Sequence, residues 1–141
     1  MSNFTPKEIE YLNSQRLGRL ATVNPAGNPQ IAPVSFRYNA ELDTIEIPGR
    51  FMTQSKKFKN ILKNPHVSFV VDDVVLSPWQ ARGVEIRGTA EAVPMGANAL
   101  FSINYPIDDT YIRISADQII GWGLEGEGAD RTNRKIEKKP A

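Results

Sequence analysis

Residues 17–38 read LGRLATVNPAGNPQIAPVSFRY and predict a β-hairpin. Two runs, 17–24 and 29–38, are strand-like, and the turn sequence NPAGN separates them. A second turn at 39–43 leads into residues 44–47, where polar and apolar side chains alternate. Strands joined by short loops usually lie next to each other, so we expect these three strands to form an antiparallel meander.

The sequence around this hairpin predicts further short elements. Thr5-Pro6-Lys7-Glu8 combines a capping box with an early proline, which predicts a helix of about ten residues. A second predicted helix covers residues 53–63, with Phe58, Ile61 and Leu62 inward. The other predicted elements are strands at 66–72, 83–93, 111–114 and 119–124, and a short helix within 94–105. Six or seven strands with two or three helices indicate a closed or partly closed antiparallel barrel.

The length and the ends of the chain set the expected organisation. A chain of 141 residues predicts one domain, at residues 1–125, and the polar residues 126–141 predict a flexible tail. No apolar run is long enough to span a bilayer, and the N-terminal residues lack the layout of a secretory signal. We therefore expect a cytoplasmic protein without a membrane partner.

The composition excludes several kinds of site. The absence of cysteine removes disulfides, thiolate metal ligands and thiol nucleophiles. The single histidine, His66, cannot build a histidine-rich zinc site and is expected to be structural. Asp72-Asp73 is expected to mark a turn and not a metal site. Residues 121–126, GWGLEG, match G-x-G-x-x-G, but too few residues follow for a dinucleotide-binding unit.

The charge distribution is uneven although the net charge is only +1. Between Glu46 and Asp72 there is no acidic residue, while five basic residues give this segment a charge of +5. The remaining 12 basic and 16 acidic residues give the rest of the chain a charge of −4. The five are Arg50, Lys56, Lys57, Lys59 and Lys63. A basic cluster on an otherwise acidic chain favours an anionic ligand.

The predicted helix at 53–63 could form a phosphate site. Thr53, Lys56, Lys57 and Asn60 are spaced to share one helix face. If the helix begins at Thr53, the amides around residues 53–55 are free to bind an anion. A solvated lysine face without a ligand is the alternative interpretation.

Two further features point to a flat ligand. Pro33 interrupts a strand-like run, which indicates an edge, a bulge or a gap that faces a ligand. Ile31, Pro33, Ser35 and Arg37 would share one face of that strand. Trp79 follows a loop proline and could stack on a flat ligand, although covering the core is the commoner role of tryptophan.

Taken in order, five segments resemble one known family. They are residues 11–23 (YLNSQRLGRLATV), 27–34 (GNPQIAPV), 55–60 (SKKFKN), 70–73 (VVDD) and 78–88 (PWQARGVEIRG). Over residues 4–124, the chain is similar to the split β-barrel flavin and deazaflavin oxidoreductases, which are related to pyridoxamine 5′-phosphate oxidase. Within that family it most resembles the class dependent on the deazaflavin coenzyme F420.

The resemblance implies a mainly β (α+β) split barrel of six or seven antiparallel strands. It also implies a homodimer with two cofactor sites at its interface, where the cofactor exchanges a hydride with a small organic substrate. No side chain is expected to be catalytic, and no metal or nucleic acid is implied. The positions that match cofactor-binding residues are Gln30, Pro33, Val34, Ser35, Arg37, Thr53, Ser55, Lys56, Lys57, Lys59 and Trp79.

These positions have different expected roles. Lys57 matches the phosphate-binding basic residue, with Ser55, Lys56, Lys59 and Thr53 as neighbours. Relatives carry arginine in this helix, whereas this chain has Ser55 and lysines, which lack the bidentate fork of arginine. The strand from Gln30 to Arg37 would lie along the ring system, and Trp79 would come from the other subunit.

Two alternatives remain open. The first keeps the fold and replaces F420 by FMN, whose shorter phosphate tail needs only the basic helix. The second is a small barrel without enzymatic activity that binds a cofactor or an oligonucleotide. Oligonucleotide binding requires aromatic residues interleaved with the basic ones, and only Phe51 and Phe58 lie within the cluster.

Overall fold

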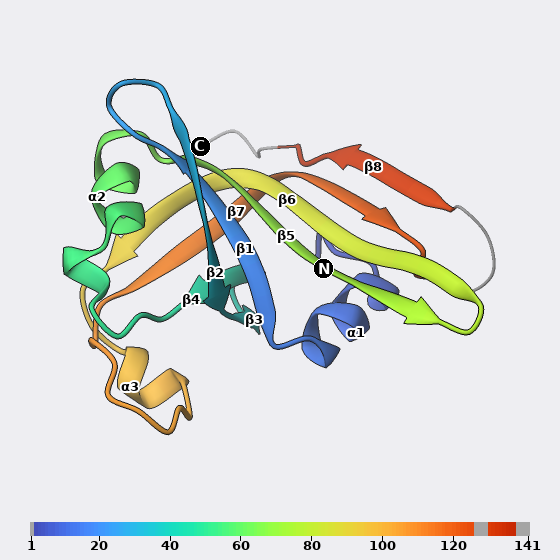
Figure 1. The fold of residues 1–141 in the computed structure, drawn as a ribbon, viewed down its shortest axis with the longest axis horizontal. Coiled ribbons are helices and arrows are strands. Elements are labelled where there is room, and N and C mark those ends of the chain that lie inside the picture. Colours follow the sequence, from blue (N-terminus) through green and yellow to red (C-terminus); the bar gives the residue numbers. More distant parts are fainter. Residues whose placement is uncertain (1, 126–129, 138–141) are drawn as a thin grey trace.

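The computed structural model describes residues 2–125 and 130–137. In chain order, the elements are α1 (Pro6–Ser14), β1 (Leu17–Val23), β2 (Pro29–Ser35), β3 (Arg37–Asn39), β4 (Thr44–Ile47), η1 (Met52–Gln54), α2 (Lys56–Lys63), β5 (His66–Leu76), β6 (Trp79–Val93), α3 (Ala97–Leu100), β7 (Tyr111–Trp122) and β8 (Arg131–Lys135). The strands form one sheet in the order β2-β1-β5-β6-β7-β4-β3, and β8 pairs with β7 (Figure 1). All these pairs are antiparallel.

The sheet curls because its two edge strands are consecutive in the chain. β2 and β3 lie at opposite ends of the strand order, yet Phe36 alone connects them. The expected hairpin of β1 and β2 is confirmed, and so is the antiparallel pairing of the run 29–38 with residues 44–47. That run is not one strand, however, because it breaks at Phe36 into β2 and β3. β4 pairs with β3 and β7 and not with β2. The curled antiparallel sheet with three short α-helices confirms the split barrel.

The core fills the inside of this curl. Val84 and Ile86 of β6 are fully buried, and so are Phe69 and Val71 of β5. At Gly18 of β1, a Cβ atom would lie 2.2 Å from the ring of Phe69. Glycine is therefore required where β1 crosses this ring, and the sheet can bend closely around its core.

The hairpin of β5 and β6 is longer than the sequence predicted. Asp72 and Asp73 lie within β5, so the turn expected there is wrong. Ion pairs with arginines on the neighbouring strands stabilise these two carboxylates within the strand. Asp72 pairs with Arg19 at 3.0 Å, and Asp73 pairs with Arg82 at 2.6 Å. Trp79 lies at the hairpin end with 69% of its surface exposed, so it does not cover the core of this chain.

Two other expectations fail in the second half of the chain. The strands predicted at 111–114 and 119–124 are one strand, β7, because a register shift opposite Arg87 and Gly88 accommodates the polar residues between them. The helix within 94–105 shrinks to the four residues of α3.

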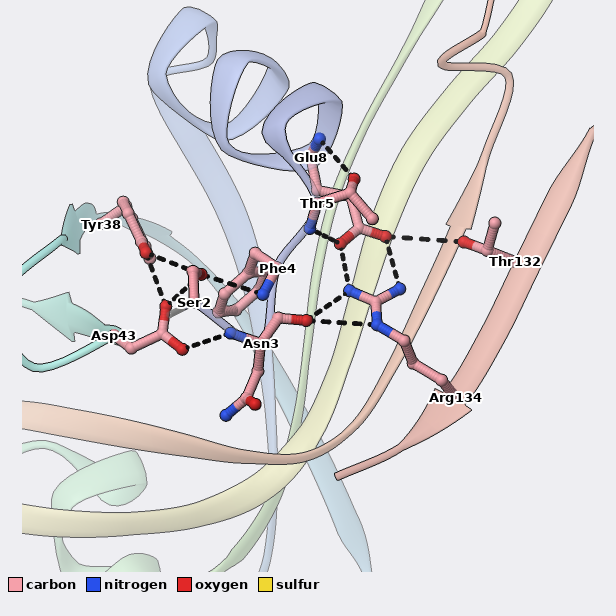
Figure 2. A network of polar contacts seen from close by, with 9 residues as sticks. All are labelled: Ser2, Asn3, Phe4, Thr5, Glu8, Tyr38, Asp43, Thr132 and Arg134. Atoms are coloured by element: carbon pink, nitrogen blue, oxygen red, sulfur yellow. Dashed lines mark hydrogen bonds and ion pairs between the residues drawn. The ribbon is translucent and has the colours of Figure 1, made fainter. Parts of the chain in front are cut away.

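The expected flexible tail is wrong for Arg131–Lys135, which form β8; residues 126–129 and 138–141 lie outside the described residues. Figure 2 shows how the N-terminal segment holds β8. The capping box of α1 is confirmed, and its Glu8 is only 1% exposed. The Glu8 carboxylate accepts hydrogen bonds from Thr5 N at 2.9 Å and from Arg134 Nη1 at 3.0 Å. A buried ion pair thus joins α1 to the last strand.

The helices within the described residues are short. The longest, α1, has nine residues, so none of them is long and apolar enough to cross a membrane.

Candidate functional site

Helix α2 begins later than the sequence predicted. A 3₁₀ turn, η1, precedes it, and Ser55 caps it by accepting a hydrogen bond from Phe58 N at 3.4 Å. The amides expected to be free are instead bonded: Thr53 N to Asp108 at 3.3 Å, Gln54 N to Phe51 O, and Ser55 N to Met52 O. The first two amides of the helix belong to Lys56 and Lys57. Amides at this position have no hydrogen-bond partner within the helix.

The inward face of α2 also differs from the prediction. Phe58 and Ile61 are buried as expected, but Leu62 is 62% exposed. Asn60, expected beside the lysines, is 3% exposed and faces the sheet. Its Nδ2 donates to Thr22 Oγ1 at 2.9 Å and to Gln30 Oε1 at 2.7 Å. Asn60 therefore attaches α2 to β1 and β2 and is not available to an outside anion.

Two small cavities lie between α2 and the β1–β2 hairpin, and we call them the lysine cavities. The first has a volume of about 170 Å³ and is lined by Gln30, Ser55, Lys56 and Lys57, among others. The second has a volume of about 260 Å³ and is lined by Gln30, Lys56, Lys59 and Lys63, among others. The structure thus brings five of the predicted site residues together: Gln30, Ser55, Lys56, Lys57 and Lys59.

The lysines of α2 have no acidic ion-pair partner among the described residues. Within the described part of the chain, all side-chain ion pairs use arginines, and none involves a lysine of α2. Lys57 is half-buried, and burial lowers its pKa because it disfavours the charged form. An anion bound in the first lysine cavity would supply the missing counter-charge. These cavities can therefore hold a phosphate or a similar group.

Strand β2 extends away from the lysine cavities with one open side. It is an edge strand of the sheet, so Pro33, opposite Arg19 of β1, removes no hydrogen bond from a central ladder. Val34 is buried, whereas Ile31 and Pro33 are exposed. The expected alternation is confirmed over these residues, and the outer face of β2 is open to a flat ligand.

The last two predicted site residues of the run 29–38, Ser35 and Arg37, do not line the lysine cavities. Ser35 and Arg37 line a separate cleft of about 510 Å³ between α1, the β2–β3 junction and the segment that follows α3. We call it the α1–α3 cleft. Arg37 Nη1 donates to Glu46 Oε1 at 2.7 Å, and Glu46 is fully buried. The sequence pattern did not separate these two residues from the rest of the strand, because the change of strand partner at Phe36, from β1 to β4, is not visible in it.

Thr53 and Trp79 also lie apart from the lysine cavities. Thr53 is exposed on η1, and its backbone amide is bonded to Asp108. Trp79 is the first residue of β6, next to the turn between β5 and β6, which Figure 1 places at the opposite end of the molecule from α2. Within one chain, Trp79 and α2 therefore do not form one site.

Comparisons with known proteins give consistent matches. The model of a family described as pyridoxamine 5′-phosphate oxidase matches residues 4–123. A 5a,11a-dehydrotetracycline/5a,11a-dehydrooxytetracycline reductase of Streptomyces rimosus subsp. rimosus is 48% identical over 125 residues, which cover 88% of this chain and 86% of the relative. A solved structure described as an F420 reductase is 26% identical, with a TM-score of 0.65, over 82% of this chain and 98% of its own. A conserved hypothetical protein of Mycobacterium tuberculosis is 25% identical, with a TM-score of 0.64, over 82% of each chain.

Proposed function

Because this chain belongs to the pyridoxamine 5′-phosphate oxidase family, we propose that it is an oxidoreductase that uses the deazaflavin coenzyme F420 to reduce a small conjugated organic substrate. Its likeness to a named reductase and to an F420 reductase supports this class of reaction. The substrate that we propose resembles those of the Streptomyces relative, which are dehydrogenated tetracyclines.

The observation that carries the proposal is the set of lysines around the lysine cavities, which form no ion pair with any described residue. Lys56 lines both cavities, Lys57 the first, and Lys59 and Lys63 the second. Lys57 and the amides that begin α2 would hold the cofactor's phosphate. The lysines of the second cavity would hold the acidic extension of the F420 tail. The residues present therefore fit a phosphorylated, acidic cofactor.

The open face of β2 would position the ring system. Pro33 offers a flat apolar surface without a competing N–H group, and buried Val34 fixes the strand beside it. When bound, the deazaflavin supplies the hydride chemistry. The chain's own residues bind it, orient it and exclude water.

We propose that the working unit is a homodimer. Neither lysine cavity alone, at about 170 and 260 Å³, reaches the usual range of roughly 300–1,000 Å³ for ligand pockets, which supports a second chain that helps to enclose the cofactor. The exposed apolar residues at the end of the β5–β6 hairpin suit that contact. They are Val74, Val75, Leu76 and Trp79. Trp79 of the partner chain would then cover the ring.

FMN is the second candidate cofactor, because its phosphate needs only the first lysine cavity. The lysines of the second cavity favour F420, whose longer tail gives them a role. Oligonucleotide binding is less well supported. Phe58 is buried against the core, and Phe51 is the exposed ring in the basic segment, so bases would have one stacking platform.

An anaerobic turnover assay tests the proposal. Purified protein is mixed with reduced F420 and 5a,11a-dehydrotetracycline, and the oxidation of F420 is followed by absorbance. The proposal predicts cofactor oxidation and one equivalent of reduced product. Turnover with reduced FMN and none with F420 would support the second candidate. Binding of neither cofactor would overturn both.

A further inference from the structure

The α1–α3 cleft is a feature of the fold that the cofactor leaves without a role. Its volume of about 510 Å³ lies within the usual range of roughly 300–1,000 Å³ for small-molecule sites. Its lining includes residues of α1, β2, β3 and α3, so the cleft is framed by regular elements and not by loops alone. Figure 1 shows α1 and α3 at the lower side of the view, on either side of the lower end of β2.

Three aromatic rings in the walls of the cleft are held in place by others. Phe36 meets Phe69 edge to face at 5.3 Å, Phe101 meets Tyr111 at 6.4 Å, and Tyr38 meets Phe4 at 5.4 Å between ring centroids. Rings fixed in this way form an apolar surface, and their side chains lose little conformational entropy when a ligand binds. The walls therefore suit a flat, conjugated molecule.

The charge of the cleft is positive. Arg16 and Arg37 line it, whereas the described lining residues include no carboxylate. The contact from Arg37 to buried Glu46 uses one of its five N–H donors and fixes the direction of the guanidinium. Arg16 is exposed and forms no ion pair within the described residues. Two arginines of this kind favour a ligand with an oxygen that carries or acquires negative charge.

Strand β2 connects this cleft with the lysine cavities. Gln30 near its start lines both lysine cavities, and Ser35 at its end lines the cleft. Five strand residues span about 17 Å, so one extended segment passes from the proposed phosphate site to the cleft. A ring system along Pro33 would have its far end beside the cleft.

We propose that the α1–α3 cleft binds the organic substrate, and that this substrate is a flat conjugated ketone whose carbonyl oxygen faces Arg16 and Arg37. The inference rests on the proposed function. A bound reduced deazaflavin would supply a hydride to the far alkene carbon; the alkene electrons would then form a double bond to the carbonyl carbon, and the carbonyl π pair would move onto the oxygen to give an enolate. A proton from water then completes the reduction. Arginine stabilises the negative charge on the oxygen.

Two variants test this cleft without altering the lysine cavities. Arg16→Gln removes the unpaired charge, and Leu100→Trp narrows the cleft at a residue that is already 38% exposed. Both should raise KM for 5a,11a-dehydrotetracycline at least fivefold, while the Kd for the cofactor stays within twofold. Arg131→Gln on β8 and Leu42→Trp in the β3–β4 turn are matched controls and should leave KM unchanged. An unchanged KM in both cleft variants, or loss of cofactor binding in both, would overturn the inference.

A binding measurement separates this inference from the proposed function. In ¹⁵N NMR spectra of the protein without cofactor, 5a,11a-dehydrotetracycline should shift the amides of residues 13–16 and 100–103 more than those of residues 56–59. If the protein shows these amide shifts but does not reduce the substrate, the substrate site in the cleft is supported and the proposed function is overturned. Turnover with amide shifts elsewhere, or no shifts at all, would retain the function and overturn the cleft.

Discussion

Asn60 of α2 and Gln30 of β2 are joined by a hydrogen bond of 2.7 Å from Nδ2 to Oε1. The same Nδ2 group donates to Thr22 of β1, which is 2% exposed. The amide of Asn60 therefore sets the position of the lysine-bearing helix relative to the strand that we propose for the cofactor ring. Sequence spacing placed Asn60 on the ligand-binding face of the helix. In the structure, Asn60 instead attaches the helix to the sheet.

Asn60→Ala should destabilise the protein by about 1–3 kcal/mol, because Thr22 would remain buried without this partner. Urea unfolding at neutral pH measures the change as a lower midpoint with an unchanged m-value. Asn104→Ala, in an exposed segment after α3, is the control and should stay within about 0.5 kcal/mol of the wild type. An equally small effect of Asn60→Ala would show that the attachment contributes little.

Arg134→Ala should destabilise the protein by about 3–5 kcal/mol, since it leaves the buried Glu8 carboxylate without its cation. The neighbouring Arg131→Ala is the matched control, because Arg131 is exposed on the same strand. Thermal unfolding of the two variants makes the comparison. Equal melting temperatures would contradict the role that we assign to β8.

Asp73→Asn should change how stability depends on pH. Hydrogen bonds from Arg82 hold the pKa of Asp73 below its ordinary value, near 3.9 in an unfolded chain. Its stabilising effect is therefore complete above about pH 4 and is lost as the pH falls through the lower, folded-state pKa. The variant should be less stable by about 1 kcal/mol at pH 7, and this difference should vanish towards pH 2. A difference that does not vary with pH would contradict the assignment.

Trp79→Glu should weaken dimer formation at least tenfold, because it places a charge in the apolar end of the β5–β6 hairpin. Sedimentation velocity over a concentration series measures the association. Leu42→Glu, which changes an exposed residue in another turn, should leave it unchanged. A wild-type protein that sediments as a monomer, or a Trp79→Glu dimer as tight as the wild type, would contradict the proposed assembly.

Local sequence signals predicted the elements whose causes are local. The capping box of α1, the turn at residues 24–28 and the end of α2 at Asn64 are set by neighbouring residues, and all three are confirmed. Strand pairing is not local. The change of partner at Phe36, the continuity of β7 and the pairing of β8 depend on residues far away in the chain, which alternation alone does not identify.

For the candidate site too, the sequence indicated the features that depend on neighbouring residues and missed those that depend on distant ones. The charge map pointed to Lys56, Lys57 and Lys59, because an acid-free segment is visible in the sequence itself, and these lysines line the lysine cavities. The start of α2 was misplaced by the 3₁₀ turn. Arg37 was grouped with the ring strand by periodicity, but its guanidinium faces Glu46 from β4. The family match confirms the resemblance, while the roles of the individual side chains remain proposals.

The most direct test of the account is a titration of the Lys57→Ala variant with F420, followed by cofactor fluorescence. Burial lowers the pKa of Lys57, which means that its charge is unfavourable in the protein without a ligand, so removing it should not lower the melting temperature. Lys135→Ala on β8 is the control. The account predicts that Lys57→Ala weakens binding at least fivefold, or about 1 kcal/mol, while the control binds like the wild type. An unchanged affinity in the folded Lys57→Ala variant would contradict the phosphate site.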